Sequence, residues 1–543
     1  MRGILKHEEG FLRKSLRTVC IRGFPESGRL KRVLGFLDIV SFGISATVGS
    51  GVFVSIGYIS KYYTGPSLFL CFVVVVCAVM LSALCFAEFS SRVNMSGIGY
   101  SYTYATYGEL VAFCVGILTF LSYSLGNAAV ARGWGDYVHC FVHAVSGYDF
   151  SDFWTSYRVN DWISISVLAP ILCMVSTLIA LSGMKESAFV ARALVIINLG
   201  IMVLFVSYGL GMYGDVSNLS PPVLPEIGWI GVIKGSGLAF FCMIGWDLMC
   251  SMTEEMKNPK RDLPRGILTA VVVVGCIYCG VSLTLSAMVP VDMISVTAPV
   301  ATAFLVHGDW NMYLLVSFVA TSICMANVLT GAVGPPRVLY TMANDGLLFA
   351  QFGKVVSHVP FTATIVCGLL NVLASGLLDF HQLASLTSCF SLIVYILVCG
   401  GVLILRTDQA RKSNGKFVCA ILAFVTSSVV FQLEFLSAAS DDWKWYAIAN
   451  LHFAAILCVV YYSSPKPFVD AKTLATPLVN EVPIAAPFKC PLVPIIPMAG
   501  MWVNSFMLAS LGGPAVATSM LVVLGCVVIY AAYGMKHSRL AIC

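Results

Sequence analysis

The chain has 543 residues, of which 58% are hydrophobic and 11% are charged, and its formal net charge is +5. Soluble domains carry about 25% charged residues, so this composition excludes an ordinary soluble domain and indicates a membrane protein with many spans. The basic residues are spread over loops rather than gathered on one face, which argues against a nucleic acid partner. The cysteines and histidines form no metal-binding or catalytic spacing, so we predict no metal, no cofactor and no enzyme activity.

Fourteen apolar segments are long enough to cross a bilayer, which takes about 20 residues. We therefore predict an all-α polytopic membrane protein with 14 transmembrane helices. The predicted spans are 36–58, 66–89, 108–131, 162–182, 188–213, 231–253, 266–289, 311–333, 362–379, 383–405, 416–436, 445–462, 493–511 and 515–534.

The charges of the loops predict the orientation of these spans. Lysine and arginine collect on the cytoplasmic side of short loops. With the N-terminus inside, the only basic residues outside are Lys61, Arg132, Arg158, Lys234 and Lys444. Both termini are therefore predicted to be cytoplasmic, and 132–161 is the longest outer loop. Asn218 lies outside in an Asn-Leu-Ser sequon and is a candidate glycosylation acceptor, although a proline follows the sequon.

The first span contains the glycine-rich run GISATVGSGVFVSIG, residues 43–57. Small residues at these positions are explained either by close helix packing or by a break in the helix at Gly49, Ser50 and Gly51. A break would free backbone N–H groups at the positive end of a half-helix, which suits a substrate carboxylate.

The sixth span carries a similar interruption at Gly245, followed by Asp247. A carboxylate in a hydrophobic segment is costly, so we expect Asp247 to be functional or strongly paired. Interruptions in the first span of each five-helix half are typical of transporters built from an inverted repeat. Free carbonyl groups at the second break would suit an ammonium group, and the two breaks together fit the zwitterionic head of an amino acid.

Other charged residues near the spans have two interpretations each. Glu88 is expected to pair with Arg92 one turn later. Glu109, at the start of the third span, either caps its helix or faces a cavity and attracts a cation. Glu254 and Glu255, after the sixth span, and Arg337, after the eighth, belong either to solvated loops or to a cytoplasmic gate.

From about residue 36 to its C-terminus, the chain resembles the cationic amino acid transporter family of the amino acid–polyamine–organocation superfamily. The most specific motifs are TEEMKNPKRDLPRGI, residues 253–267, and YTMANDGLL, residues 340–348. Further similarity lies in GSGVF (49–53), AEFSSRV (87–93), SGIGYSYTYATYGELVAF (96–113), AAVARGW (128–134), GMKESA (183–188), FFCMIGWD (240–247) and the final PFKCPLVPIIPMAGMWVNSFMLASL (487–511).

The resemblance implies a five-plus-five inverted-repeat core with four additional helices. The repeats would be 36–213 and 231–405, flanked by a basic N-terminal tail, 1–35, accessory helices 416–462, a cytoplasmic linker, 463–492, accessory helices 493–534 and a C-terminal tail, 535–543. It implies that the substrate carboxylate is held by Thr47, Gly49, Ser50 and Gly51, and the ammonium group by the carbonyls of Phe241, Cys242 and Ile244. Phe241 would also be an aromatic gate, and Gly331 and Ala332 would leave room for a long side chain.

One position departs from the proton-coupled bacterial relatives, which carry a lysine on the fifth span. The matching position here is Asn198, which cannot take up and release a proton near neutral pH. We therefore predict transport without obligatory proton coupling.

These observations predict a transporter of cationic amino acids such as arginine, lysine and ornithine. The alternatives are a carrier of neutral amino acids or polyamines, with or without protons, and an amino acid-sensing receptor. We expect the plasma membrane as its location, with a vacuolar or lysosomal membrane as the alternative, and no heavy-chain subunit, because Cys140 alone is weak evidence for one.

Overall fold

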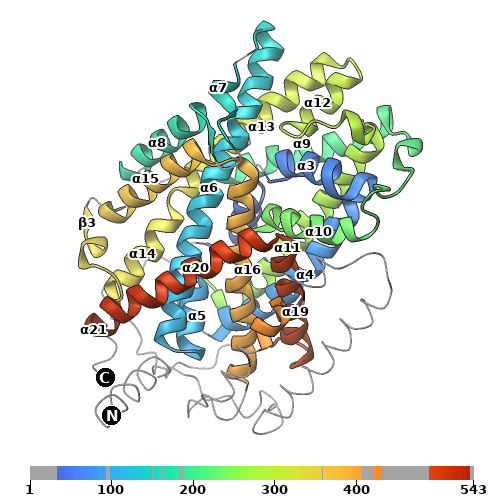
Figure 1. The fold of residues 1–543 in the computed structure, drawn as a ribbon. Coiled ribbons are helices and arrows are strands. Elements are labelled where there is room, and N and C mark those ends of the chain that lie inside the picture. The colour runs from blue at the N-terminus through green and yellow to red at the C-terminus, as the bar shows by residue number, and fades with distance from the viewer. Residues whose placement is uncertain are drawn as a thin grey trace.

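A computed structural model gives the fold of the chain (Figure 1). It describes residues 34–49, 51–92, 98–149, 151–160, 163–182, 188–356, 359–406, 421, 424–430, 432 and 488–538. The predicted N-terminal tail up to residue 33, most of the accessory segment 416–462, most of the linker 463–492 and the end of the C-terminal tail lie outside the described residues.

The first half of the described chain is helical from α2 to α9. Its elements are α2 (Phe36–Thr47), η2 (Gly51–Ser55), α3 (Ile56–Ile59), η3 (Ser60–Thr64), η4 (Gly65–Ser67), α4 (Leu68–Arg92), α5 (Ile98–Thr106), α6 (Glu109–Ser146), α7 (Asp152–Thr155), β1 (Tyr157–Arg158), β2 (Ser164–Ile165), α8 (Leu168–Leu181) and α9 (Ala188–Tyr213).

The remaining described elements run from η5 to α21 and end in a C-terminal hairpin, α19–α20. The elements are η5 (Val216–Leu219), α10 (Ile230–Ala239), η6 (Phe240–Met243), η7 (Trp246–Glu255), α11 (Pro259–Met288), η8 (Val291–Met293), α12 (Pro299–Val306), α13 (Trp310–Gly331), α14 (Gly334–Asn344), η9 (Ala350–Gly353), β3 (Val355–Val356), β4 (Val359–Pro360), α15 (Phe361–Leu377), α16 (Phe380–Leu405), α19 (Ile495–Ser510), α20 (Gly513–Ile529), η10 (Tyr530–Gly534) and α21 (Met535–His537). The strands form two short antiparallel pairs, β1–β2 and β3–β4.

Local sequence explains where several of these helices begin and end. Asp309 caps α13 by accepting a hydrogen bond from the backbone N–H of Met312 at 3.1 Å. Asp379 and Gln382 form a capping box at the start of α16. At the other end of α6, Gly147 takes a left-handed conformation with φ of +68°, which glycine adopts without steric cost.

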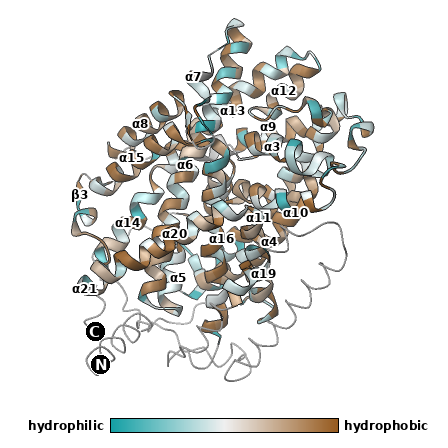
Figure 2. Cartoon of the chain, in the orientation of Figure 1, coloured by the Kyte–Doolittle hydropathy of each residue, from teal (hydrophilic) through white to brown (hydrophobic). Residues whose placement is uncertain are grey.

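Long helices side by side make up the core. Helix α4 packs along α11, and α6 packs along both α13 and α16. Figure 2 shows hydrophobic residues along most of the helices. Within the described residues, eight helical segments are long and apolar enough to cross a membrane, and α8, α15 and α19 are shorter apolar helices.

The structure corrects the prediction for the third span. Helix α6 does not end near residue 131 but continues to Ser146, so the expected outer loop 132–161 is much shorter. Residues 132–146 are too polar for a hydropathy criterion, yet Arg132, Tyr137 and Cys140 are buried against neighbouring elements. At about 1.5 Å per residue, the 38-residue helix is roughly 57 Å long, and it reaches from α5 to α7 (Figure 1).

Candidate functional site

The first apolar span is interrupted in the middle. Helix α2 ends at Thr47, Val48 is extended with φ of −81° and ψ of 100°, and helical structure resumes at Gly51. The Thr47 hydroxyl donates to the Gly43 carbonyl at 2.8 Å, so it supports the last turn of α2. Ser50 lies outside the described residues. An interruption of this kind leaves backbone polar groups without helical partners.

The sixth apolar span is interrupted as well. Helix α10 passes through the short turn η6 to Ile244, which is extended, and to Gly245, whose φ is +119°. Only glycine adopts this φ readily, because a side chain would clash with the backbone. Helical structure then resumes at Trp246. The glycine therefore permits the change of direction between the two halves of the span.

The two interruptions contact each other. A Cβ atom added to Gly51 would lie 2.8 Å from the Cα atom of Cys242. A Cβ atom added to Gly245 would lie 2.3 Å from the carbonyl oxygen of Ala46. Both distances are too short for a real side chain, so these two glycines allow the broken spans to approach closely. The free backbone groups of both interruptions thus lie in one region of the molecule.

Neighbouring helices hold the first interruption in place. The side-chain amide of Asn327, on α13, donates to the carbonyls of Ser45 at 3.2 Å and Val48 at 3.4 Å. The Tyr278 hydroxyl, on α11, donates to the Thr47 carbonyl at 3.3 Å. The sequence analysis missed both residues. A polar amide within an apolar helix was the available signal for Asn327.

Aromatic contacts cover the region on the side of α7. Phe241 is 7% exposed and packs edge to face on Phe380, with ring centroids 5.7 Å apart. Tyr58 stacks on His381 at 3.7 Å. Both pairs join a broken span to the start of α16. Phe241 therefore lies where an aromatic gate could separate the interruptions from that end of the molecule.

The small residues predicted for the side-chain pocket lie at the end of α13. Ala332 is buried, and a Cβ atom on Gly331 would lie 2.5 Å from Oδ1 of Asn127 on α6. This Oδ1 atom is buried without a hydrogen-bond partner in the described part of the chain. Gly331 lies one turn after Asn327, so both belong to the same end of α13.

Asp247 and Asn198 are both buried polar residues. Asp247 is 4% exposed, and its Oδ2 atom accepts a hydrogen bond from the hydroxyl of Tyr123 on α6 at 2.8 Å. Its Oδ1 atom, and Oδ1 of Asn198, have no hydrogen-bond partner among the described residues. Asp247 follows the second interruption directly, and its bond to Tyr123 connects that span to α6.

Glu109 lies away from the interruptions, at the start of α6. Its carboxylate accepts hydrogen bonds from three hydroxyl groups, those of Tyr104 at 3.1 Å, Tyr530 at 3.1 Å and Ser538 at 2.9 Å. Tyr530, in η10, and Ser538, after α21, come from the C-terminal end of the described chain. Glu109 thus joins the start of α6 to the C-terminal end of the described chain.

The other predicted gating residues lie around the end of η7 and on α14. The backbone carbonyl of Glu255 accepts from Leu34 at 3.0 Å, and nothing is described for the Glu254 side chain. Arg337 is exposed on α14. In η5, the side-chain amide of Asn218, the candidate glycosylation acceptor, donates to the Ala287 carbonyl at 2.9 Å.

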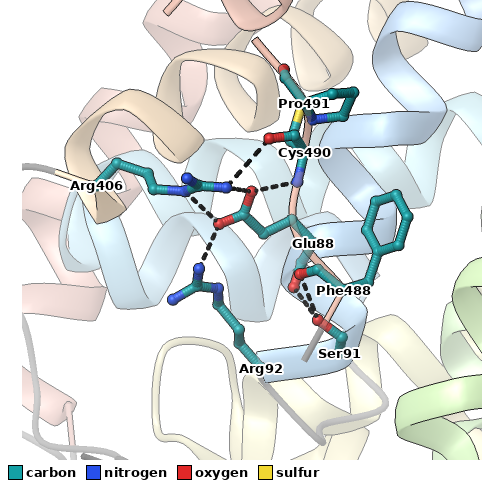
Figure 3. A network of polar contacts seen from close by, with 7 residues as sticks. All are labelled: Glu88, Ser91, Arg92, Arg406, Phe488, Cys490 and Pro491. Atoms are coloured by element: carbon teal, nitrogen blue, oxygen red, sulfur yellow. Dashed lines mark hydrogen bonds and ion pairs between the residues drawn. The ribbon is translucent and has the colours of Figure 1, made fainter. Parts of the chain in front are cut away.

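A buried ion cluster connects α4 and α16 to the segment that precedes α19 (Figure 3). Glu88 is fully buried and pairs with Arg92 at 2.7 Å, as the sequence predicted. Arg406, at the end of α16, donates to both carboxylate oxygens at 2.8 Å. The backbone N–H of Cys490, before α19, donates to the same carboxylate at 2.9 Å. One carboxylate therefore holds three separate segments together.

Comparison with known proteins identifies the family. Residues 34–466 match the model of the amino acid permease family, and residues 488–538 match the model of the C-terminus of these permeases. The chain belongs to the amino acid permease family. The permease is thus a multi-pass membrane protein related to transporters and not to enzymes, and its resemblance to cationic amino acid transporters is confirmed.

Three curated relatives come from Arabidopsis thaliana. The vacuolar cationic amino acid transporter 2 is 28% identical, over 98% of this permease and 94% of the relative. The chloroplastic cationic amino acid transporter 7 is 27% identical, over 90% and 82%. The mitochondrial cationic amino acid transporter 3 is 28% identical, over 94% and 92%. The similarity therefore covers nearly the whole of each chain.

Proposed function

We propose that this permease carries cationic amino acids across a membrane by alternating access. The observation that carries the proposal is the contact between the two interrupted spans, at Gly51 with Cys242 and at Gly245 with Ala46. Paired discontinuous helices are how many carriers build a substrate site at the middle of the bilayer. Their free N–H groups favour a carboxylate and their free carbonyls favour an ammonium group.

In this proposal, the backbone around Gly49, Ser50 and Gly51, with Thr47, binds the substrate carboxylate. The carbonyls of Phe241, Cys242 and Ile244 bind the ammonium group. Phe241 closes the site by packing on Phe380, as it does here. Gly331 and Ala332 provide space for the substrate side chain.

The matching contacts of the two halves support a five-plus-five inverted repeat. Helices α4 and α11, each following an interrupted span, pack along one another, and α6 and α13, next in each half, do the same. With the C-terminal hairpin α19–α20 and the two accessory helices predicted within 416–462, the architecture has 14 spans. The N-terminus and C-terminus lie on the cytoplasmic side, as the loop charges indicate.

We further propose that the membrane potential drives uptake without obligatory proton coupling. Asn198 offers no group that titrates near neutral pH. A potential of 100 mV contributes about 2.3 kcal/mol per charge, which corresponds to roughly 50-fold accumulation of a monovalent cation. A cationic substrate therefore needs no symported ion.

The names of the three relatives favour a cationic substrate, since each is called a cationic amino acid transporter. The same names place them in the vacuole, the chloroplast and the mitochondrion, whereas our sequence analysis favours the plasma membrane. A fluorescent fusion of the permease, compared with markers of each membrane, distinguishes these locations.

The deciding experiment is uptake of radiolabelled arginine into proteoliposomes that contain the purified permease. We expect uptake to follow an imposed negative-inside potential, to be competed by lysine and to be insensitive to an inward proton gradient. Protein-free liposomes and an excess of unlabelled arginine are the controls. Uptake that requires the proton gradient would contradict the uncoupled mechanism. Transport of leucine or a polyamine in place of arginine would contradict the substrate assignment, and binding without uptake would favour a receptor.

A further inference from the structure

A small polar cavity lies beside the Phe241–Phe380 pair, on the side of α7. Its volume is about 50 Å³. Its polar lining comes from α6, from the end of α7, from the segment before α12 and from the start of α16, and it includes Arg132, Asp136, Thr155, Asp379 and His381. A site for one water molecule needs about 10–15 Å³, so this cavity holds more than one water but far less than a whole amino acid.

Asp136 makes no direct ion pair or hydrogen bond with the described residues that line this cavity. Its carboxylate accepts no hydrogen bond from a described residue and lies within ion-pair distance of none of the described basic side chains, although it is only one turn after Arg132. A carboxylate in a largely buried position is stable only when it is paired or solvated. Asp136 therefore has the capacity to bind a further group.

Arg132 does not neutralise the cavity by direct contact, because its guanidinium is engaged elsewhere. The side chain is 3% exposed and donates to the Thr155 carbonyl at 3.4 Å, to the Ser164 hydroxyl at 3.5 Å and to the Ser164 carbonyl. Its Nε atom and Nδ1 of His381 are buried without partners in the described part of the chain. Arg132 thus holds Thr155 and Ser164 near the cavity.

The charge balance of the cavity favours a cation. Asp379 takes part in the capping box with Gln382. No described residue donates a hydrogen bond to the Asp136 carboxylate. Among the residues that line the cavity, with a neutral His381, two carboxylates and one guanidinium leave one negative charge uncompensated. Arg158, whose charge also reaches His381, does not line the cavity and is exposed to solvent, which screens its charge. A single compact cation, an ammonium or a guanidinium group, would neutralise the cavity and use the free oxygens of Asp136.

The position of the cavity connects it to the proposed transport path. Phe380 lines the cavity and also packs on Phe241, the proposed gate. Val54, in η2 just after the first interruption, lines it as well. A group bound in this cavity therefore lies next to the proposed gate.

We propose that Asp136, assisted by Asp379, forms a second binding site that holds the cationic end of a substrate side chain before the substrate passes the Phe241–Phe380 pair. This proposal rests on the proposed function, because it assumes a cationic substrate. The site selects charge on the way to the central site and raises the local concentration of cationic substrates. A neutral amino acid of similar size gains nothing from it.

The test compares arginine uptake by the wild-type permease, Asp136→Asn, Asp136→Glu and Asp149→Asn in proteoliposomes. Asp149 is an exposed carboxylate shortly after the same helix, so its variant controls for loss of surface charge. We expect Asp136→Asn to raise KM about 10-fold, equivalent to about 1.4 kcal/mol, with Vmax within about twofold of wild type. We expect Asp136→Glu to recover part of this loss and Asp149→Asn to behave as wild type. An unchanged KM in Asp136→Asn, or a loss of Vmax alone, would overturn the proposal.

A binding measurement separates this site from the transport function. Millimolar methylguanidinium should raise the melting temperature of the detergent-purified wild-type permease and of Asp149→Asn, but not of Asp136→Asn, relative to sodium at equal ionic strength. Failure to stabilise the wild type would refute the site. Stabilisation that depends on Asp136, in a protein that does not take up arginine, would refute the proposed function and leave the site standing as a site for a free cation.

Discussion

The buried cluster around Glu88 provides the sharpest prediction for stability. Glu88 is 0% exposed, and the side chains of its partners Arg92 and Arg406 are 11% and 10% exposed. Replacing Glu88 with glutamine keeps the shape but removes the charge that both guanidinium groups share. Breaking a buried ion pair in this way costs about 3–5 kcal/mol, because a desolvated charge is left without its partner. We expect Glu88→Gln to lower the free energy of unfolding by that amount.

A double-mutant cycle distinguishes loss of the pair from general damage. Arg406→Met alone should destabilise the permease to a similar degree, because Glu88 then loses two of its hydrogen bonds. The double variant should lose less than the sum of the single variants, since coupled residues interact by about 0.5–3 kcal/mol. Arg261→Met, at an exposed position on α11, is the control and should stay within about 0.5 kcal/mol of wild type.

Unfolding in mixed micelles, followed by tryptophan fluorescence, gives these free energies. The reasoning is refuted if Glu88→Gln is as stable as wild type, or if the single effects of Glu88 and Arg406 are simply additive. Either result would mean that the contacts in Figure 3 contribute little to holding the C-terminal hairpin against α4 and α16.

Three further predictions concern the interruptions and Asp345, which directly follows α14. Gly245→Ala should abolish uptake, because its φ of +119° and its contact with the first span leave no space for a methyl group, whereas Gly525→Ala, with no atom within 4 Å of the added carbon, should transport normally. Asn327→Ala should slow uptake by about 10-fold or more by freeing two buried carbonyls, at a cost of about 1–3 kcal/mol, whereas the exposed Asn311→Ala on the same helix should not. Burial raises the pKa of Asp345 to about 6, against a hydrogen bond that lowers it, so ionisation above this pH costs stability. Melting temperatures measured from pH 7 to pH 4 should therefore rise for wild type relative to Asp345→Asn, and the opposite trend would contradict this assignment.

Hydropathy predicted the long helices well. Each predicted span that falls within the described residues has a helix at its position, and the fifth span coincides with α9. The same criterion missed α5 and α14, which carry too many polar and small residues to resemble membrane spans. It also ended α6 early, because the criterion measures transfer to lipid, whereas Arg132, Tyr137 and Cys140 in the last part of α6 are buried against protein.

The site was predicted only in part, because local signals do not identify distant partners. Glycines inside apolar spans indicated the two interruptions, and a carboxylate inside an apolar span indicated that Asp247 is important. Arg406, however, is 318 residues from Glu88, and Asn327 is 282 residues from Ser45. Such pairs are created by the packing of helices and cannot be derived from the spacing of residues along one segment. Glu109 illustrates the same limit, since two of its three hydrogen-bond donors come from the other end of the chain.

Helix α6 contacts both interrupted spans through single hydrogen bonds. The Tyr137 hydroxyl donates to the Phe53 carbonyl at 2.7 Å, just after the first interruption. The Tyr123 hydroxyl donates to Asp247 at 2.8 Å, just after the second. Each tyrosine thus holds the second half of one broken span. The glycines at the breaks allow the first half of each span to run in a different direction. A single hydrogen bond contributes about 1 kcal/mol net, or about 1.5–3 kcal/mol to a charged group. In the proposed transport cycle, both contacts could therefore be exchanged while the packing of α6 on α13 and α16 persists.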